Sequence, residues 1–251
     1  MRGMNPTGFS KGNQNKISSF TMTGDIAVSG NVMSLIDYTQ EIYTIPSTKC
    51  FSSLFNGCSA LSSIVGLTLP ATTLSETCYY EMFYNCTNLT EVPILPARDL
   101  APGCYGSMFM GCTGLVSVPE DLLPAVHLKD NCYFQMFCNC SNLKQAPTLP
   151  ASILERTCYN NMFYGCHNLT YLKCLATNIS AENCTKNWFY LSGSVPAGIF
   201  VKDPNMISWT TGDDGIPTGW TVMDSLDNSA LYATILDLET RVTALEAYHN
   251  T

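Results

Sequence analysis

Cysteine recurs along this chain at a nearly constant interval, and this periodicity constrains the fold more than any other feature. A first series returns every 26 or 28 residues, and a second series lies eight residues after its first five members. Repetition at such intervals predicts about six units that stack, because a single unit cannot bury its own apolar face. The first series is Cys50, Cys78, Cys104, Cys132, Cys158 and Cys184; the second is Cys58, Cys86, Cys112, Cys140 and Cys166.

Most units read Cys-aromatic-x-x-Met-Phe-x-Gly/Asn-Cys-Ser/Thr-x-Leu and continue to Leu-Pro-Ala. Apolar residues at i, i+1, i+4 and i+5 predict one stripe of a two-turn helix. Thr77 or Asn131 suits its N-cap, and the Gly or Asn before the second cysteine suits its end. The run that follows, such as 89–92, predicts a brief strand that ends in a proline turn. We therefore expect an α/β fold, a leucine-rich-repeat solenoid of about six 26–28-residue repeats with a C-terminal coiled-coil helix.

The coiled-coil prediction comes from the end of the chain, where Gly, Pro and Cys are absent after Leu226. Apolar residues there follow the 4-3-4-3 spacing of a coiled-coil seam, and a helix this short needs partners for stability. An Arg-hydrophobic-x-x-hydrophobic-Glu motif inside it resembles one associated with parallel trimers, so we expect a homotrimer. A helix docked on its own repeats is the open alternative. The predicted oligomerisation residues are Leu231, Ile235, Leu238, Arg241, Val242, Leu245 and Glu246.

Thirteen cysteines cannot all pair within one chain, and the periodic ones give an interior thiol two equal neighbours. The sequence therefore favours columns of buried, reduced thiols over disulfides between units. A metal site has little support because no Cys-x-x-Cys is present. A further column, formed by Tyr79, Tyr105, Tyr133 and Tyr159, fits stacked core aromatics, with a sugar-binding stripe as the alternative.

The search for catalytic chemistry finds no candidate residues, so we expect no enzymatic activity, no cofactor and no metal. His127, His167 and His249 share no motif, and no phosphate-binding, dinucleotide or hydrolase signature is present. Asp213-Asp214 fits an acidic turn better than a calcium site, which needs six to eight oxygen ligands.

Charge and hydropathy restrict the partners. The net charge of −8 argues against nucleic acid, and no 18-residue apolar stretch supports membrane insertion. The N-terminal residues also lack the apolar run of a secretory signal, from which we expect a chain that carries no export signal of its own.

The Cys-Tyr-x-x-Met-Phe-x-Gly-Cys-Thr-x-Leu and Leu-Pro-Ala units resemble the BspA-type leucine-rich-repeat proteins of Bacteroides and their phages. The flanks 29–35 and 198–222 add to this resemblance, which covers about residues 22–223. It implies a surface or recognition role, since the family is known for binding. We expect an N-terminal anchoring arm (1–20), an N-terminal cap (21–49), the repeats (50–200), a C-terminal cap (201–224) and the trimerisation helix (225–251).

These observations lead to a hypothesis of a non-enzymatic virion structural protein of a Bacteroides-infecting phage, a head or tail fibre or decoration protein. Its expected partners are its own copies, other virion proteins contacted through the arm or the tail, and a host surface glycan or protein. The alternative is a bacterial cell-surface adhesin that binds host protein or polysaccharide. The residues expected to contact the ligand are Thr90, Glu91, Lys144, Gln145 and Tyr171.

Overall fold

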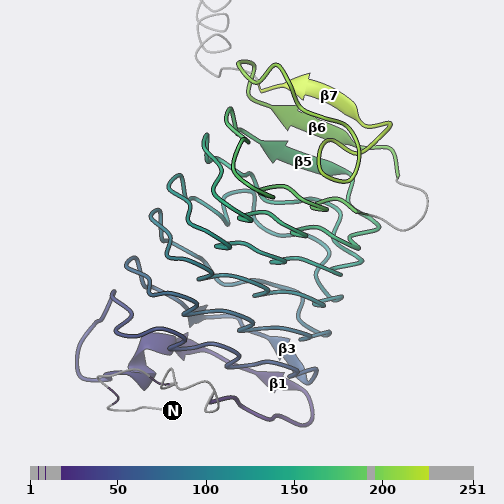
Figure 1. The fold of residues 1–251 in the computed structure, drawn as a ribbon. Coiled ribbons are helices and arrows are strands. Elements are labelled where there is room, and N and C mark those ends of the chain that lie inside the picture. The colour runs from purple at the N-terminus through teal and green to yellow at the C-terminus, as the bar shows by residue number, and fades with distance from the viewer. Residues whose placement is uncertain (1–4, 6–8, 10–17, 191–195, 226–251) are drawn as a thin grey trace, which may run out of the picture.

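The computed structural model describes residues 5, 9, 18–190 and 196–225 of the 251-residue chain. The repeat units lie on one another in sequence order (Figure 1). We number them 1 to 6 by their first cysteines, from Cys50 to Cys184. The regular elements are β1 (Ile26–Ala27), β2 (Gly30–Asn31), the 3-10 helix η1 (Val32–Leu35), β3 (Leu61–Ser63), β4 (Leu67–Thr68), β5 (Tyr171–Cys174), β6 (Ile199–Lys202) and β7 (Thr221–Asp224).

All strand pairing is parallel and joins one layer of the stack to the next. The N-terminal strands β1 and β2 pair with β3 and β4 of unit 1, while β5, β6 and β7 form one three-stranded sheet at the other end. Within the described residues, no helix is long and apolar enough to cross a membrane.

The segment that runs from the residue before the first cysteine of each unit to its second cysteine, which we name the turn wall, is a chain of tight turns. In unit 1, alternate amides from Lys49 to Gly57 donate to carbonyls of unit 2 at 2.7–3.0 Å. The amides between them, from Ser52 to Cys58, donate to the carbonyl three residues earlier. Every fourth residue, here Lys49, Ser53 and Gly57, has a positive φ. Each amide from 51 to 58 thereby has a partner, either in its own turn or in the next unit.

The predicted helical leucine-rich-repeat solenoid is therefore wrong. Among the described residues there is no α-helix, and the strands form three small, separate sheets. A spacing of i, i+1, i+4 and i+5 fits a four-residue turn period as well as a helix, and a left-handed residue at every fourth position interrupts the i to i−4 ladder. Thr77 and Asn131, the expected N-caps, have φ values of 51° and 57° and do not cap helices. Asn85 and Gly111 are left-handed as expected, but they end turns.

The predicted coiled-coil helix is not part of the fold that the structure describes, because residues 226–251 lie outside the described residues. The same holds for the seven predicted oligomerisation residues, from Leu231 to Glu246. The homotrimer stays a prediction.

The segment after the second cysteine, which we name the strand wall, is less regular than predicted. It spans 61–65, 89–93, 115–120, 143–148 and 169–174 in units 1 to 5. Units 2 to 4 hold Pro93, Pro119 and Pro147 there and form at most isolated bridges, whereas units 1 and 5 have Val65 and Lys173 and form β3 and β5. Proline removes a backbone donor and restricts its predecessor, so a strand forms only where proline is absent.

Two columns of stacked rings fill the core. Tyr79, Tyr105, Tyr133 and Tyr159 stack with ring centroids 5.8–6.1 Å apart, and each is at most 2% exposed. This confirms the core interpretation of these tyrosines and excludes the sugar-binding stripe. The second column contains Phe55, Phe83, Phe109, Phe137 and Phe163, at 5.3–5.9 Å.

The last unit closes the stack with tryptophan. Thr185 replaces the column tyrosine, and the Trp188 ring takes the vacant place, 6.2 Å from Tyr159. Its indole N–H donates to the Gly215 carbonyl at 2.7 Å, and the Thr185 hydroxyl donates to the Asp214 carbonyl at 2.8 Å. Thr185 and Trp188 therefore allow unit 6 to bind the loop that covers it, which contains Asp214 and Gly215.

Candidate functional site

The structure places three of the five predicted ligand residues side by side on the strand wall. Gln145 is paired with Tyr171 of the next unit, and the Thr170 amide donates to the Lys144 carbonyl at 2.9 Å. Thr90 and Glu91 hold the equivalent positions in unit 2. The Glu91 carboxylate is turned toward unit 1, where it accepts from the Ser63 hydroxyl at 2.9 Å. Unit 3 separates this pair from the other three.

A polar string beside Tyr171 extends the site across three units. The Glu120 carboxylate accepts from the Thr148 hydroxyl at 3.0 Å and lies 3.7 Å from the Lys173 ammonium. The Lys173 side chain is 29% exposed and that of Glu120 is 58% exposed, so the ion pair is open to solvent on one side. Burial, and then the Glu120 charge, raise the pKa of the Tyr171 phenol, which keeps its proton at neutral pH.

Glu120, Thr148 and Lys173 are site residues that the sequence did not single out. Two signals mark them in retrospect. Glu120 lies in the two-residue insertion of a 28-residue unit, and Lys173 stands where the preceding three units have proline. Departures from the repeat thus supply the charged groups of this wall.

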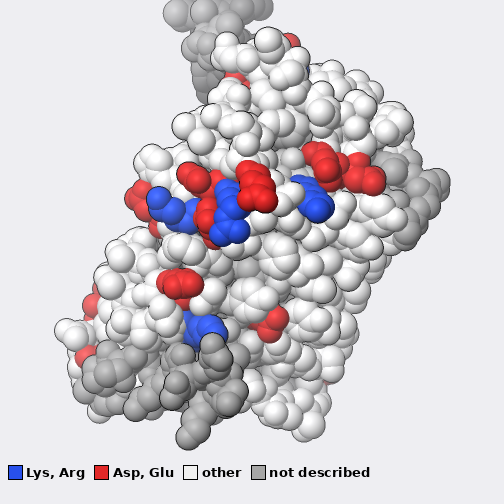
Figure 2. Space-filling view, in the orientation of Figure 1, with Lys and Arg blue, Asp and Glu red and all other residues white. Residues whose placement is uncertain are grey.

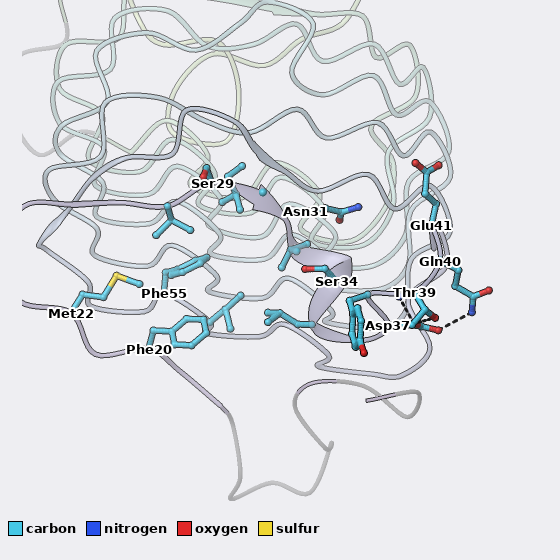
Figure 3. A pocket seen from close by; sticks show the side chains of 17 residues that line it. Phe20, Met22, Ser29, Asn31, Ser34, Asp37, Thr39, Gln40, Glu41 and Phe55 are labelled. Atoms are coloured by element: carbon cyan, nitrogen blue, oxygen red, sulfur yellow. Dashed lines mark hydrogen bonds between the residues drawn. The ribbon is translucent and has the colours of Figure 1, made fainter. Parts of the chain in front are cut away.

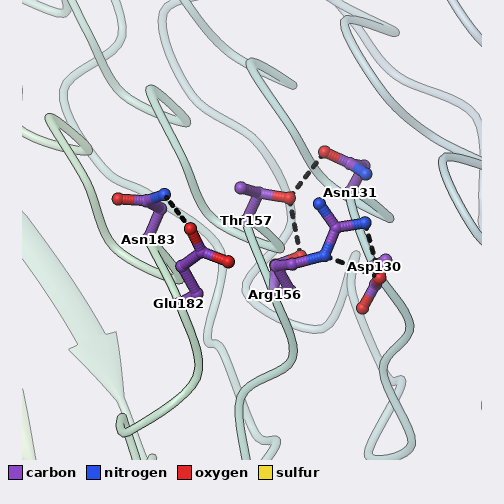
Figure 4. A network of polar contacts seen from close by, with 6 residues as sticks. All are labelled: Asp130, Asn131, Arg156, Thr157, Glu182 and Asn183. Atoms are coloured by element: carbon purple, nitrogen blue, oxygen red, sulfur yellow. Dashed lines mark hydrogen bonds and ion pairs between the residues drawn. The ribbon is translucent and has the colours of Figure 1, made fainter.

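A second polar cluster lies where each unit turns toward the next first cysteine, at the corner 151–157 of unit 4 and its neighbours. Arg156 contacts the Asp130 carboxylate at 2.8 Å, and the Thr157 hydroxyl donates to the Asn131 side chain at 2.6 Å (Figure 4). Acidic and basic side chains also alternate in a band across the face seen in Figure 2. Opposite charges paired between neighbouring units align the units, and this cluster is already neutralised within the chain.

The histidines contribute no catalytic arrangement in the part of the chain that is described. His127 Nδ1 lies 2.6 Å from the Asp99 carboxylate, but both side chains are at least 74% exposed. The pair itself contains no nucleophilic side chain such as serine or cysteine. His167 is exposed in the turn after Cys166. The carboxylate of Asp214 accepts the Asn187 amide, so the acidic pair 213–214 serves as the turn that covers unit 6.

A hollow of about 760 Å³ lies between the N-terminal segment and unit 1 (Figure 3). Phe20, Met22 and Phe55 form part of its apolar lining. At its rim the Asp37 carboxylate accepts from the Thr39 hydroxyl and the Gln40 amide, and the Thr39 hydrogen bonds lower its pKa. No His, Cys or Lys is among the described residues that line it.

The thirteen cysteines are all unpaired and buried, as the columns of thiols predicted. The cysteines of the second series have an additional role, because their thiols donate to phenylalanine carbonyls of the preceding unit. Cys86, Cys112 and Cys140 do so at 3.0–3.1 Å. Burial raises the pKa of Cys138 to about 11 and that of Cys86 to about 12, so these thiols are protonated and poorly nucleophilic. Among the described residues no three His, Cys, Asp or Glu side chains form a group able to hold a metal ion.

No family model, curated protein or solved structure matches this chain. The resemblance to BspA-type proteins therefore stays a prediction from the repeat motif, and the candidate site is defined by geometry alone.

Proposed function

We propose that this chain is a non-enzymatic structural protein of a phage virion that presents its strand wall to the surface of a bacterial host. One observation carries the recognition role. Gln145, Tyr171 and Lys173 lie together on the strand wall, with the Glu120 carboxylate held against Lys173 and Thr148. A phenol, an amide and a solvent-facing ion pair on a rigid framework are groups that orient a polar ligand.

The cysteines support assembly in a reducing cytoplasm, which is where virion proteins are made. Thirteen unpaired thiols are exposed together while the chain folds, and an oxidising compartment would link them before they are buried. A secreted adhesin would have to fold under those oxidising conditions. This argument favours the virion over the cell surface.

Two experiments test the proposal. Mass spectrometry of purified phage particles should detect the polypeptide, and its absence from particles would overturn the virion assignment. Particles that carry Tyr171→Ala or Gln145→Ala should adsorb to host cells at least about tenfold more slowly. Arg156→Ala, which changes the corner and leaves the strand wall intact, is the matched control, and equal adsorption of all variants would remove the recognition role.

A further inference from the structure

Five aromatic side chains lie on the outer side of the turn wall, where the core does not require them. All five are only partly buried, whereas the core rings of the same segments, such as Tyr79 and Phe83, are fully buried. We name the five the aromatic track. They are Tyr80, Tyr84, Phe134, Tyr164 and Tyr190.

The backbone does not demand rings at these positions. Tyr80 and Tyr84 precede the left-handed residues of the turn wall and have ordinary backbone angles. The positions equivalent to Tyr80 hold Gly106 in unit 3 and Lys186 in unit 6, so small and charged residues fold equally well there. The rings therefore point to a role outside folding.

Hydrogen bonds between units set the track in two parallel rows, with Tyr80 and Phe134 in one row and Tyr84, Tyr164 and Tyr190 in the other. In the second row Met110 and Cys138 stand between Tyr84 and Tyr164. The carbonyls of Tyr84, Met110, Cys138, Tyr164 and Tyr190 each accept an amide of the preceding unit at 2.6–3.1 Å. At about 4.8 Å per unit, this row extends about 19 Å along the stack. The rings of Tyr164 and Tyr190 are stacked, with centroids 5.2 Å apart.

Tyr80 shows how a ring is laid on this surface. A Cβ atom at Gly106 would lie 2.9 Å from Tyr80 Cδ2, so the ring extends over the next unit because that residue is glycine. Burial, and then the nearby Glu81 charge, raise the pKa of its phenol. The ring covers backbone on one side and is partly exposed, which leaves an apolar surface with a hydroxyl at its edge.

The polar groups between the rings are almost all neutral. Amides of Gln135, Asn160 and Asn161 lie in rows beside them. The Glu81 carboxylate accepts from Ser53 and Asn56 at 3.2 and 3.1 Å, so its charge is engaged within the protein. Among the described residues that lie between the first- and second-cysteine positions of the units, Lys186 is the other charged one. Rings with neutral amides suit a ligand rich in hydroxyl groups and without charge.

We infer that the aromatic track is a second binding surface, which takes a neutral polysaccharide chain lying along the stack. Sugar C–H faces would pack on the rings, and sugar hydroxyls would bond to the amides and phenols. The inference goes beyond the proposed function and does not depend on it, because the track and the strand wall are different sides of the units. Each is tested with its own variants.

The test is affinity gel electrophoresis of the full chain in gels that contain dextran, yeast mannan or laminarin as neutral probes, and hyaluronate as the acidic probe. At least one neutral probe should retard the protein. Tyr80→Ala and Tyr164→Ala should weaken that retardation at least about tenfold each, since stacking rings dominate such contacts. Arg156→Ala, at the corner, should leave it unchanged. Circular dichroism melting checks that each variant folds, and Gln135→Ala provides a third variant that removes no ring.

Three results would overturn the inference. They are no retardation by any neutral probe, retardation by hyaluronate alone, and equal retardation of the wild type and the track variants. Light scattering of the full chain tests whether a second copy of the chain occupies the track. Self-association that Tyr80→Ala abolishes would assign the track to a second copy of the chain and would also overturn it.

Discussion

The turn wall and the strand wall belong to the same units, yet they are held together very differently. Between units 2 and 3, five turn-wall amides, from Thr77 to Asn85, donate across the boundary, and the same five positions do so at each later boundary up to unit 6. On the strand wall between units 3 and 4, two amides do so, from Lys144 and Thr148. The hydrogen bonds of the turn wall therefore hold the units in position on one another. The strand wall tolerates prolines, insertions and charges, and this freedom suits the recognition role proposed for it.

The largest expected effect is alkaline unfolding of the turn wall, which holds twelve of the thirteen cysteines, all except Cys174. Burial raises the thiol pKa values, to about 12 for Cys86 and Cys132. Above about pH 9 the unfolded chain releases thiol protons that the folded chain keeps, so the free energy of unfolding falls as pH rises. Each thiol adds a slope of about 1.4 kcal/mol per pH unit once it is ionised in the unfolded chain.

Urea titrations followed by circular dichroism should therefore show full stability below about pH 8 and loss of the fold between about pH 9 and 10. Cys138→Ala should reduce the slope of the free energy of unfolding against pH by the contribution of one thiol. A free energy of unfolding that stays constant up to pH 10.5 would contradict the burial of the thiols.

The next effect tests the glycines of the turn wall. In Gly111→Ala, the new Cβ would clash with Asn85 Oδ1, at a residue with φ of 75°. Gly57→Ala is the matched control, because its φ is 72° and nothing lies within 4 Å. Left-handed alanine costs about 1–2 kcal/mol in both variants, and the clash adds about 1–3 kcal/mol in the first alone.

The difference should appear in urea midpoints, and Asn85→Gly should restore part of the loss in Gly111→Ala. Equal destabilisation by the two alanines would show that the asparagine does not lie over the glycine of the next unit.

A smaller effect is expected in the tyrosine column. The Tyr79 hydroxyl is buried without a hydrogen-bond partner, and unit 1 has Phe51 in the same column. Tyr79→Phe should therefore leave stability unchanged or raise it by about 1 kcal/mol, because an unpaired polar group leaves the core. Calorimetry measures this change. A loss of stability would mean that the hydroxyl is hydrogen-bonded, with an internal water as the simplest partner.

The smallest effect belongs to the corner. Arg156 and Asp130 are 53% and 40% exposed, so solvent screens their attraction. A double-mutant cycle with Arg156→Ala and Asp130→Ala should give a coupling of about 0.2–1 kcal/mol that decreases with salt. A larger, salt-independent coupling would show that the corner also helps to hold neighbouring units in position.

The candidate site was partly predictable. Lys144, Gln145 and Tyr171 follow the apolar repeat with outward polar residues, and that pattern was enough to find them. Glu120 and Lys173 were not found, because they are 53 residues apart in sequence and meet only when units 3 and 5 are in register over unit 4. The aromatic track was not found, because its residues fall at two different positions of the repeat and recur in only some of the units.

The sequence by itself determined that the chain repeats, which side chains of each unit are buried, and that Gly and Asn before the second cysteine are left-handed. Those features follow from residue type and period, which are local. The tertiary structure decided that the segments between cysteines are turns and not helices. Their spacing fits both, and the choice is made by alternate amides whose hydrogen-bond partners lie in the next unit, 25 to 27 residues away in most pairs. No single unit contains that information, because the acceptors exist only when the units are stacked.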